Sequence, residues 1–93
     1  MARYVTLIRF TDQGARAIRK STARALAFKK AAEKAGIAVE AQLWTVGACD
    51  GVLILSGDEK KVLRCLTQFA ALGNARTETM RAFDANEFKA ITG

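Results

Sequence analysis

The chain has 93 residues, of which 51% are hydrophobic and 26% charged, and this fits one compact domain over residues 1–93. It contains no histidine and two cysteines, which excludes histidine catalysis and predicts no metal site or cofactor. No apolar run approaches the roughly 20 residues that span a bilayer, and no signal-peptide pattern opens the sequence. We therefore expect a cytoplasmic protein with no membrane partner.

The first 35 residues predict a strand followed by a helix. Residues 3–10 carry apolar side chains on both faces, as a central strand does. Asp12 is predicted to cap a helical turn, and Ser21 with Thr22 to start the main helix, which ends at Gly36. Over residues 15–35 helical spacing separates an apolar face from a basic one: Ile18, Ala25, Phe28 and Ala32 against Arg16, Lys20, Lys30 and Lys34.

The net charge of +6 is placed largely on this helix. A basic face serves either solubility or an anionic partner. Because no aromatic residues stand among these lysines and arginines to stack on bases, we expect no nucleic-acid partner.

A β-hairpin is predicted in the middle of the chain. Residues 37–46 form its first strand, with Val39, Ala41, Leu43 and Thr45 on one face. Residues 52–55 are an unbroken apolar run, typical of a strand buried on both faces. Between them Gly47, Asp50 and Gly51 suit a tight reversal.

The remaining residues predict a helix, a strand and a short helix. Asp58 caps a helix whose apolar stripe ends before Gly73; the stripe consists of Val62, Cys65, Leu66, Phe69 and Ala70. Residues 76–83 form a fourth strand, and Asp84 caps a terminal helix that holds Phe88 and Ile91.

The predicted fold class is α+β, a ferredoxin-like βαββαβ unit with a short C-terminal helix. The first and third strands take the centre of the sheet, and both main helices cover one face of it. The other face keeps apolar residues of these two strands, which predicts a homodimer through the sheet face, or a higher assembly of dimers. The alternative is a monomer whose terminal helix lies across that face.

Three segments stand out for their residue pattern: Leu7–Gly14, Trp44–Asp50 and Leu72–Phe83. They resemble the GYD domain family, small bacterial proteins with the fold of the dimeric α+β barrels, and the resemblance covers nearly the whole chain. It implies the ferredoxin-like unit and a face-to-face dimer, and it implies no activity. Cys49 stands where the family usually has tyrosine.

Two candidate site residues lie in the hairpin turn. Asp50 either accepts backbone N–H bonds within the hairpin or places a carboxylate at the rim of a cavity. Cys49 is expected beside it, as an apolar filler or as a thiolate nucleophile activated by a cation. A disulfide with Cys65 is the alternative to two reduced thiols.

The other candidates are polar or aromatic residues of strands and their ends. Asn74 and Arg76 follow a helix stop, and Arg9 and Arg81 place cations in strands, where an ion pair with Glu78 or Asp50 competes with a ligand site. Tyr4 and Trp44 complete the set, either near a cavity or as packing.

Three functions remain open at this level. The first is a dimeric module that binds a small-molecule ligand or serves assembly. The second is a small-molecule enzyme of the cofactor-independent oxygenase or isomerase type. The third is an anion or nucleic-acid binder that uses the basic helix face. The residues contain no motif that selects the enzyme.

Overall fold

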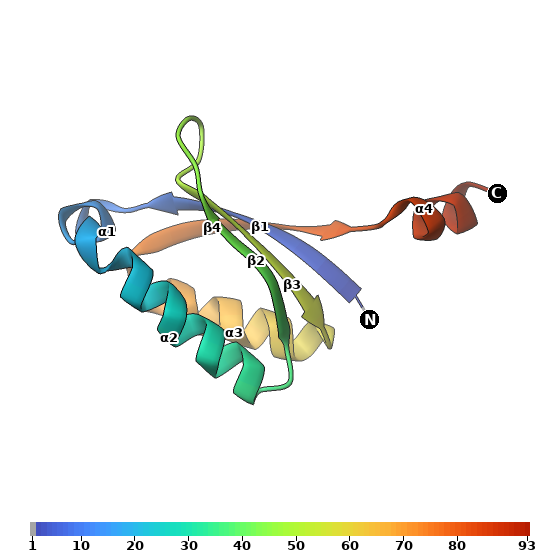
Figure 1. Ribbon diagram of the computed structural model, residues 1–93, viewed down its shortest axis with the longest axis horizontal. Coiled ribbons are helices and arrows are strands. Elements are labelled where there is room, and N and C mark those ends of the chain that lie inside the picture. The colour runs from blue at the N-terminus through green and yellow to red at the C-terminus, as the bar shows by residue number, and fades with distance from the viewer. Residues whose placement is uncertain (1) are drawn as a thin grey trace.

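The computed structural model describes residues 2–93, which form one four-stranded sheet with two long helices on one side (Figure 1). The elements in chain order are β1 (Ala2–Phe10), α1 (Asp12–Arg16), a 3-10 turn η1 (Ile18–Lys20), α2 (Ser21–Lys34), β2 (Ala38–Trp44), β3 (Gly51–Gly57), α3 (Glu59–Ala71), β4 (Ala75–Ala82) and α4 (Ala85–Thr92).

The sheet has the order β2-β3-β1-β4, and every neighbouring pair is antiparallel. The two strands with apolar residues on both faces, β1 and β3, are therefore the central ones, as predicted. With α2 and α3 packed on one face, the ferredoxin-like α+β fold is confirmed. None of the helices in the described part of the chain is long and apolar enough to cross a membrane.

Two predicted helix caps are wrong and two are right. Thr11, not Asp12, caps α1, because Thr11 keeps the extended backbone of β1 and its hydroxyl accepts from the Gly14 N–H. Ser21 does not cap α2, since its backbone is already helical after η1. Asp58 and Asp84 cap α3 and α4 as predicted.

The predicted faces of β2 are wrong beyond residue 39. The register against β3 shifts between Val39 and Ala41, which leaves Glu40 as an extra residue, a β-bulge. Val39 consequently pairs with the buried Leu55 on the helix side, whereas Leu43 pairs with Val52 on the opposite side. Trp44 thereby faces α2.

The core lies between the sheet and the two helices. Its buried residues are Tyr4, Ala32, Ile37, Leu53, Leu55, Val62 and Leu66. Two residues that the spacing assigned to buried helix faces are exposed. Ile18 lies in η1 outside the α2 stripe, and Ala70 lies in the last turn of α3.

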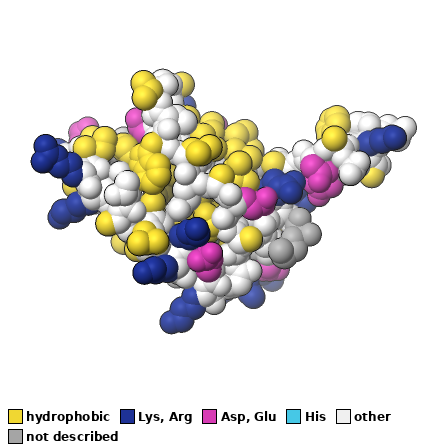
Figure 2. Space-filling model, in the orientation of Figure 1, with side chains coloured by type: hydrophobic (Ala, Val, Ile, Leu, Met, Phe, Trp, Pro, Cys, Tyr) yellow, Lys and Arg dark blue, Asp and Glu magenta, His cyan; other side chains and the backbone are white. Residues whose placement is uncertain are grey.

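The opposite face of the sheet is open. It carries apolar side chains from all four strands: Val5, Leu7, Ala41, Leu43, Val52, Ile54 and Met80. The terminal helix α4 does not lie across this face, because it projects beyond the end of the sheet as an arm (Figure 1). The arm carries hydrophobic side chains of its own, Phe88 and Ile91, which are 57% and 61% exposed (Figure 2).

Candidate functional site

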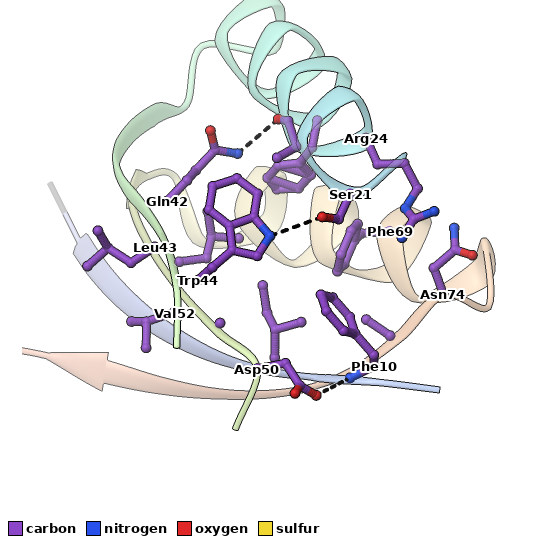
Figure 3. Close-up of a pocket in the computed structure, with 16 residues that line it drawn as sticks. Phe10, Ser21, Arg24, Gln42, Leu43, Trp44, Asp50, Val52, Phe69 and Asn74 are labelled. Carbon is purple, nitrogen blue, oxygen red and sulfur yellow. Dashed lines mark hydrogen bonds between the residues drawn. The ribbon is translucent and has the colours of Figure 1, made fainter. Parts of the chain in front are cut away.

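A cavity of about 60 Å³ lies between the sheet and the two helices, at the hairpin end of β3 (Figure 3). Residues of six segments line it: Ile8, Phe10, Ser21, Arg24, Ala25, Phe28, Gln42, Leu43, Trp44, Asp50, Gly51, Val52, Leu53, Phe69, Asn74 and Ala75. Such a cavity, apolar with a few polar groups, is the usual form of a small-molecule site.

Aromatic rings form much of the cavity wall. Phe28 of α2 and Phe69 of α3 meet edge to face, with ring centroids 5.4 Å apart. Trp44 closes the side toward solvent; it is 49% exposed, and its indole N–H donates to the Ser21 hydroxyl over 3.2 Å. Gln42, on the same face of β2, donates to the Ala25 carbonyl over 2.9 Å. These two hydrogen bonds fix the separation between β2 and α2.

Gly51 lines the cavity at the start of β3. It pairs with Trp44 on one side and Ile8 on the other, so a side chain here would point toward the helices. A Cβ atom at this position would lie 3.0 Å from the Leu43 carbonyl oxygen. Gly51 is therefore favoured by this close approach and not by a turn conformation, whereas Gly47 does adopt a positive φ of 142°.

Asp50 lines the cavity and ties the hairpin to β1. Its carboxylate accepts the Phe10 N–H over 2.8 Å, and its own N–H donates to the Ile8 carbonyl over 2.7 Å. The expected backbone acceptor role is thus present, but the donor lies in β1 and not within the turn. Asp50 extends the β1–β3 pairing by one residue before Gly51, where β3 begins.

Cys49 does not line the cavity. Its carbonyl accepts from the Thr45 hydroxyl over 2.6 Å, and its sulfur lies 3.5 Å from the Thr45 hydroxyl oxygen. Cys49 therefore helps to close the hairpin loop. Both Cys49 and Cys65 are free thiols. The hairpin is further held by Arg9, whose Nε donates to the Ala48 carbonyl over 3.0 Å.

Asn74 is positioned by a polar junction between two loops. The Thr11 N–H donates to the Asn74 carbonyl over 3.1 Å, and the Thr11 hydroxyl to the Gly73 carbonyl over 2.6 Å. Gln13 donates to the Asn74 side-chain oxygen and to the Leu72 carbonyl, both over 2.9 Å. Gly14 completes the junction, because a Cβ atom there would collide with the Asn74 carbonyl.

The other predicted site residues lie away from the cavity. Tyr4 is buried in the core, and the Arg81 guanidinium lies over its ring and over that of Phe83. Arg9 and Arg76 face each other across β1 and β4 on the open side of the sheet. Of the eight candidates, the cavity therefore brings together Trp44, Asp50 and Asn74.

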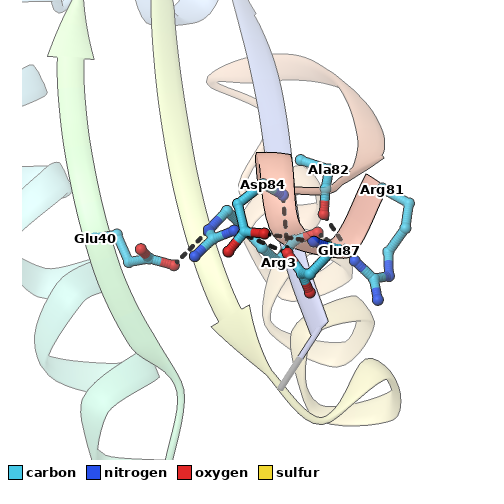
Figure 4. A network of polar contacts seen from close by, with 6 residues as sticks. All are labelled: Arg3, Glu40, Arg81, Ala82, Asp84 and Glu87. Atoms are coloured by element: carbon cyan, nitrogen blue, oxygen red, sulfur yellow. Dashed lines mark hydrogen bonds and ion pairs between the residues drawn. The ribbon is translucent and has the colours of Figure 1, made fainter. Parts of the chain in front are cut away.

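The expected ion pairs of strand arginines with Glu78 or Asp50 do not occur in the described residues. The ion pairs there belong to Arg3, which contacts Glu40 of β2 at 3.3 Å and Glu87 of α4 at 3.4 Å (Figure 4). Arg81 instead donates to the Ala82 carbonyl at 2.8 Å. Residues 2–93 also contain no cluster of three or more metal-ligating side chains.

Sequence reasoning missed several lining residues, chiefly Ser21, Arg24 and Gln42. A signal existed for Arg24, which lies one turn before Phe28 and next to Ala25 on the buried side of α2. No such signal existed for Gln42, because the bulge at Glu40 decides which way it faces.

A second hollow, about 270 Å³, lies between α2 and α3. It is lined only by residues of these helices and the turn after α3, and it shares Phe28 and Phe69 with the cavity. It is larger but offers Arg24 and Gln68 as its only polar side chains among those lining it. The cavity, with polar groups from four segments, is the better candidate.

The model of one protein family matches the chain, the GYD domain, over residues 4–92. A search of curated proteins and a search of solved structures found no match. The three segments that carry the resemblance noted above, distant in sequence, supply Phe10, Trp44, Asp50 and Asn74 to the same cavity.

Proposed function

Since the chain belongs to the GYD domain family, whose match spans the elements that build the cavity, we propose that it is a homodimeric module that binds a small molecule. The observation that carries the proposal is the cavity itself. Aromatic rings from β1, α2, β2 and α3 surround a space that Gly51 of β3 also lines.

The cavity suits a ligand with an apolar body and few polar atoms. Its wall consists mainly of rings and aliphatic side chains, which gain free energy by covering an apolar ligand. Its polar side chains come from separate elements and can fix the orientation of such a ligand. The site residues are Phe10, Ser21, Arg24, Phe28, Gln42, Trp44, Asp50, Phe69 and Asn74.

Trp44 makes binding directly measurable, because it is the one tryptophan of the chain and part of the cavity wall. We expect small ring compounds such as benzamide to change its fluorescence saturably. Ala25→Leu fills the cavity and should abolish the change. Ala23→Leu, on the exposed side of the same helix, is the matched control and should leave it intact. A response that never saturates, or that survives Ala25→Leu, would refute the site.

The proposed partner on the open sheet face is a second copy of the chain. Leu43 and Met80 are 57% and 44% exposed there, next to half-buried apolar residues of β1 and β3. A contiguous apolar surface of this kind usually serves association, and two sheets pack face to face at about 10 Å.

Charge favours an arrangement in which opposite ends of the two sheets meet. Arg9 and Arg76 lie opposite each other at one end of the open face and have no ion pair among the described residues. At the other end Glu40 and Glu87 share Arg3, which leaves an excess negative charge. A two-fold axis perpendicular to the strands brings each arginine pair to the partner's acidic end.

Sedimentation equilibrium tests the dimer. The wild type should show twice the chain mass of 10.1 kDa at micromolar concentration. Leu43→Glu should shift it to the monomer, whereas Leu63→Glu, at a similarly exposed leucine of α3, should not. A monomeric wild type, or equal behaviour of both variants, would contradict the proposal.

A further inference from the structure

One end of the cavity offers hydrogen-bond donors that the protein itself does not fully use. They belong to Arg24 of α2 and to Asn74, in the turn between α3 and β4. We propose that the ligand is a small apolar monocarboxylate, whose carboxylate binds Arg24 and Asn74 and whose apolar body lies among the rings. This inference rests on the proposed function and adds the chemical class of the ligand.

The positive charge of Arg24 is uncompensated. Its two terminal nitrogens donate to backbone carbonyls, to Ala17 over 3.1 Å and to Gly14 over 3.5 Å. No carboxylate lies within ion-pair distance of it among the described residues. A guanidinium has five N–H donors, so further donors remain for a bound group. The two carbonyl bonds fix its position at the cavity without neutralising it.

The side-chain amide of Asn74 is oriented by its neighbour. Gln13 donates to the Asn74 oxygen over 2.9 Å, so this oxygen is occupied as an acceptor. The Asn74 nitrogen therefore keeps its two N–H groups for a ligand. In Figure 3 this nitrogen points toward the part of the view that holds Arg24.

Gly14 brings the two donors to the same end of the cavity. Its carbonyl accepts from Arg24, and its Cα packs against the Asn74 carbonyl so closely that no side chain fits. A guanidinium and an amide at one end form the donor set that a carboxylate prefers, and charge-assisted bonds are roughly twice as strong as neutral ones.

Asp50 limits the ligand to one negative charge. Its carboxylate also lines the cavity, but Figure 3 shows it on the opposite side from Arg24, bonded to the Phe10 N–H. A second acidic group on the ligand would meet this carboxylate and be repelled. The cavity, about 60 Å³, is smaller than the roughly 150 Å³ that holds a benzene molecule, so it limits the apolar body to at most a single ring, part of which stays outside the enclosed volume.

The test compares benzoate with benzamide, which has the same shape without the charge, and with acetate, which has the charge without the ring. Trp44 fluorescence and thermal shift report binding. We expect benzoate to bind the wild type at least tenfold tighter than either of the other two. Asn74→Asp keeps the oxygen that Gln13 binds and adds a negative charge, and should weaken benzoate at least tenfold while changing benzamide less than twofold. Asn86→Asp on the exposed α4 makes the same charge change away from the cavity and should have no effect.

Arg24→Gln gives a second, independent measurement and should remove the preference for benzoate. Equal binding of benzoate and benzamide, or equal effects of Asn74→Asp and Asn86→Asp, would overturn the carboxylate assignment and leave the cavity as a site for neutral ligands. Acetate binding as tightly as benzoate would overturn the proposal that an apolar body lies among the rings. If no ring compound gives a saturable response, the proposed function fails together with the inference.

Discussion

The two faces of the sheet differ although the same strands build both. In β3 the residues alternate strictly: Leu53 and Leu55 are 3% and 0% exposed on the helix side, whereas Val52 and Ile54 are half-buried on the open side. All four side chains are apolar. The strand therefore carries hydrophobicity for two layers, of which its own chain supplies one. Apolar composition thus marks where a covering layer is required, and the open side is where we propose that a second copy packs.

The largest expected loss of stability distinguishes the two faces of the sheet, and it is measured by substituting two adjacent residues of β3. Leu55→Ala should lower the free energy of unfolding by about 2–5 kcal/mol at any protein concentration, because it leaves a cavity in the core. Ile54→Ala should cost less, and its cost should grow with protein concentration as the dimer becomes populated. Urea unfolding at two concentrations measures both. Equal, concentration-independent losses would erase the distinction between the faces.

A smaller effect is expected at the junction that closes the helix side of the sheet. Gly14→Ala should lower the free energy of unfolding by about 1–3 kcal/mol, because the new Cβ meets the Asn74 carbonyl. Gly47→Ala is the control: a Cβ there meets no atom within 4 Å, so only the positive φ opposes it, at about 1 kcal/mol, the lower end for a strained backbone because the exposed loop can relax. Thermal melts of both variants measure the two losses of stability. A larger loss for Gly47→Ala than for Gly14→Ala would show that the junction can move to make room for the new Cβ atom.

Asp50 should contribute about 1 kcal/mol, the lower end for an unpaired donor, since Phe10 is only half-buried. Asp50→Ala loses the acceptor for the Phe10 N–H, whereas Asp50→Asn keeps one and should lose less. Thermal melts test this, and an Asp50→Ala variant as stable as the wild type would discard the structural role.

The smallest effect is expected on the solvent side of α2. Lys30→Glu and Lys34→Glu should change the free energy of unfolding by less than about 0.5 kcal/mol, because both side chains are exposed. The wild type should also show no salt-sensitive retention on immobilised DNA or RNA. Tight retention that rises at low salt and disappears in the double variant would reinstate a nucleic-acid partner.

Local signals in the sequence were sufficient for the fold. The apolar residues on both sides of β1 and β3 predicted their central places, and Asp58 and Asp84 predicted two helix starts. The errors occurred where one element runs directly into the next. Thr11 caps α1 from the end of β1, and Ser21 continues a helical turn that the pattern treated as a break.

The cavity could be predicted only in part. Asp50 was predicted from the turn and Trp44 as an aromatic residue of a strand, but the rings of Phe10, Phe28 and Phe69 meet only after three elements have packed. In the sequence each of these rings belongs to an apolar stripe and is indistinguishable from a core residue. The space that remains among them depends on how closely these elements pack, and helical or strand periodicity does not report packing distances.

The bulge at Glu40 has a consequence for how the protein meets other copies in a crowded solution. Both outer strands of an open sheet can template further strands, and pairing along an edge has no natural end, so it leads to fibres. Glu40 interrupts the regular edge of β2 with an extra residue and a charge, while β4 presents exposed Arg76, Glu78 and Arg81. The face-to-face contact that we propose ends at two copies, because each copy buries its one open sheet face in it. The chain thus discourages polymerisation at its edges, while the open apolar face remains available for the proposed dimer.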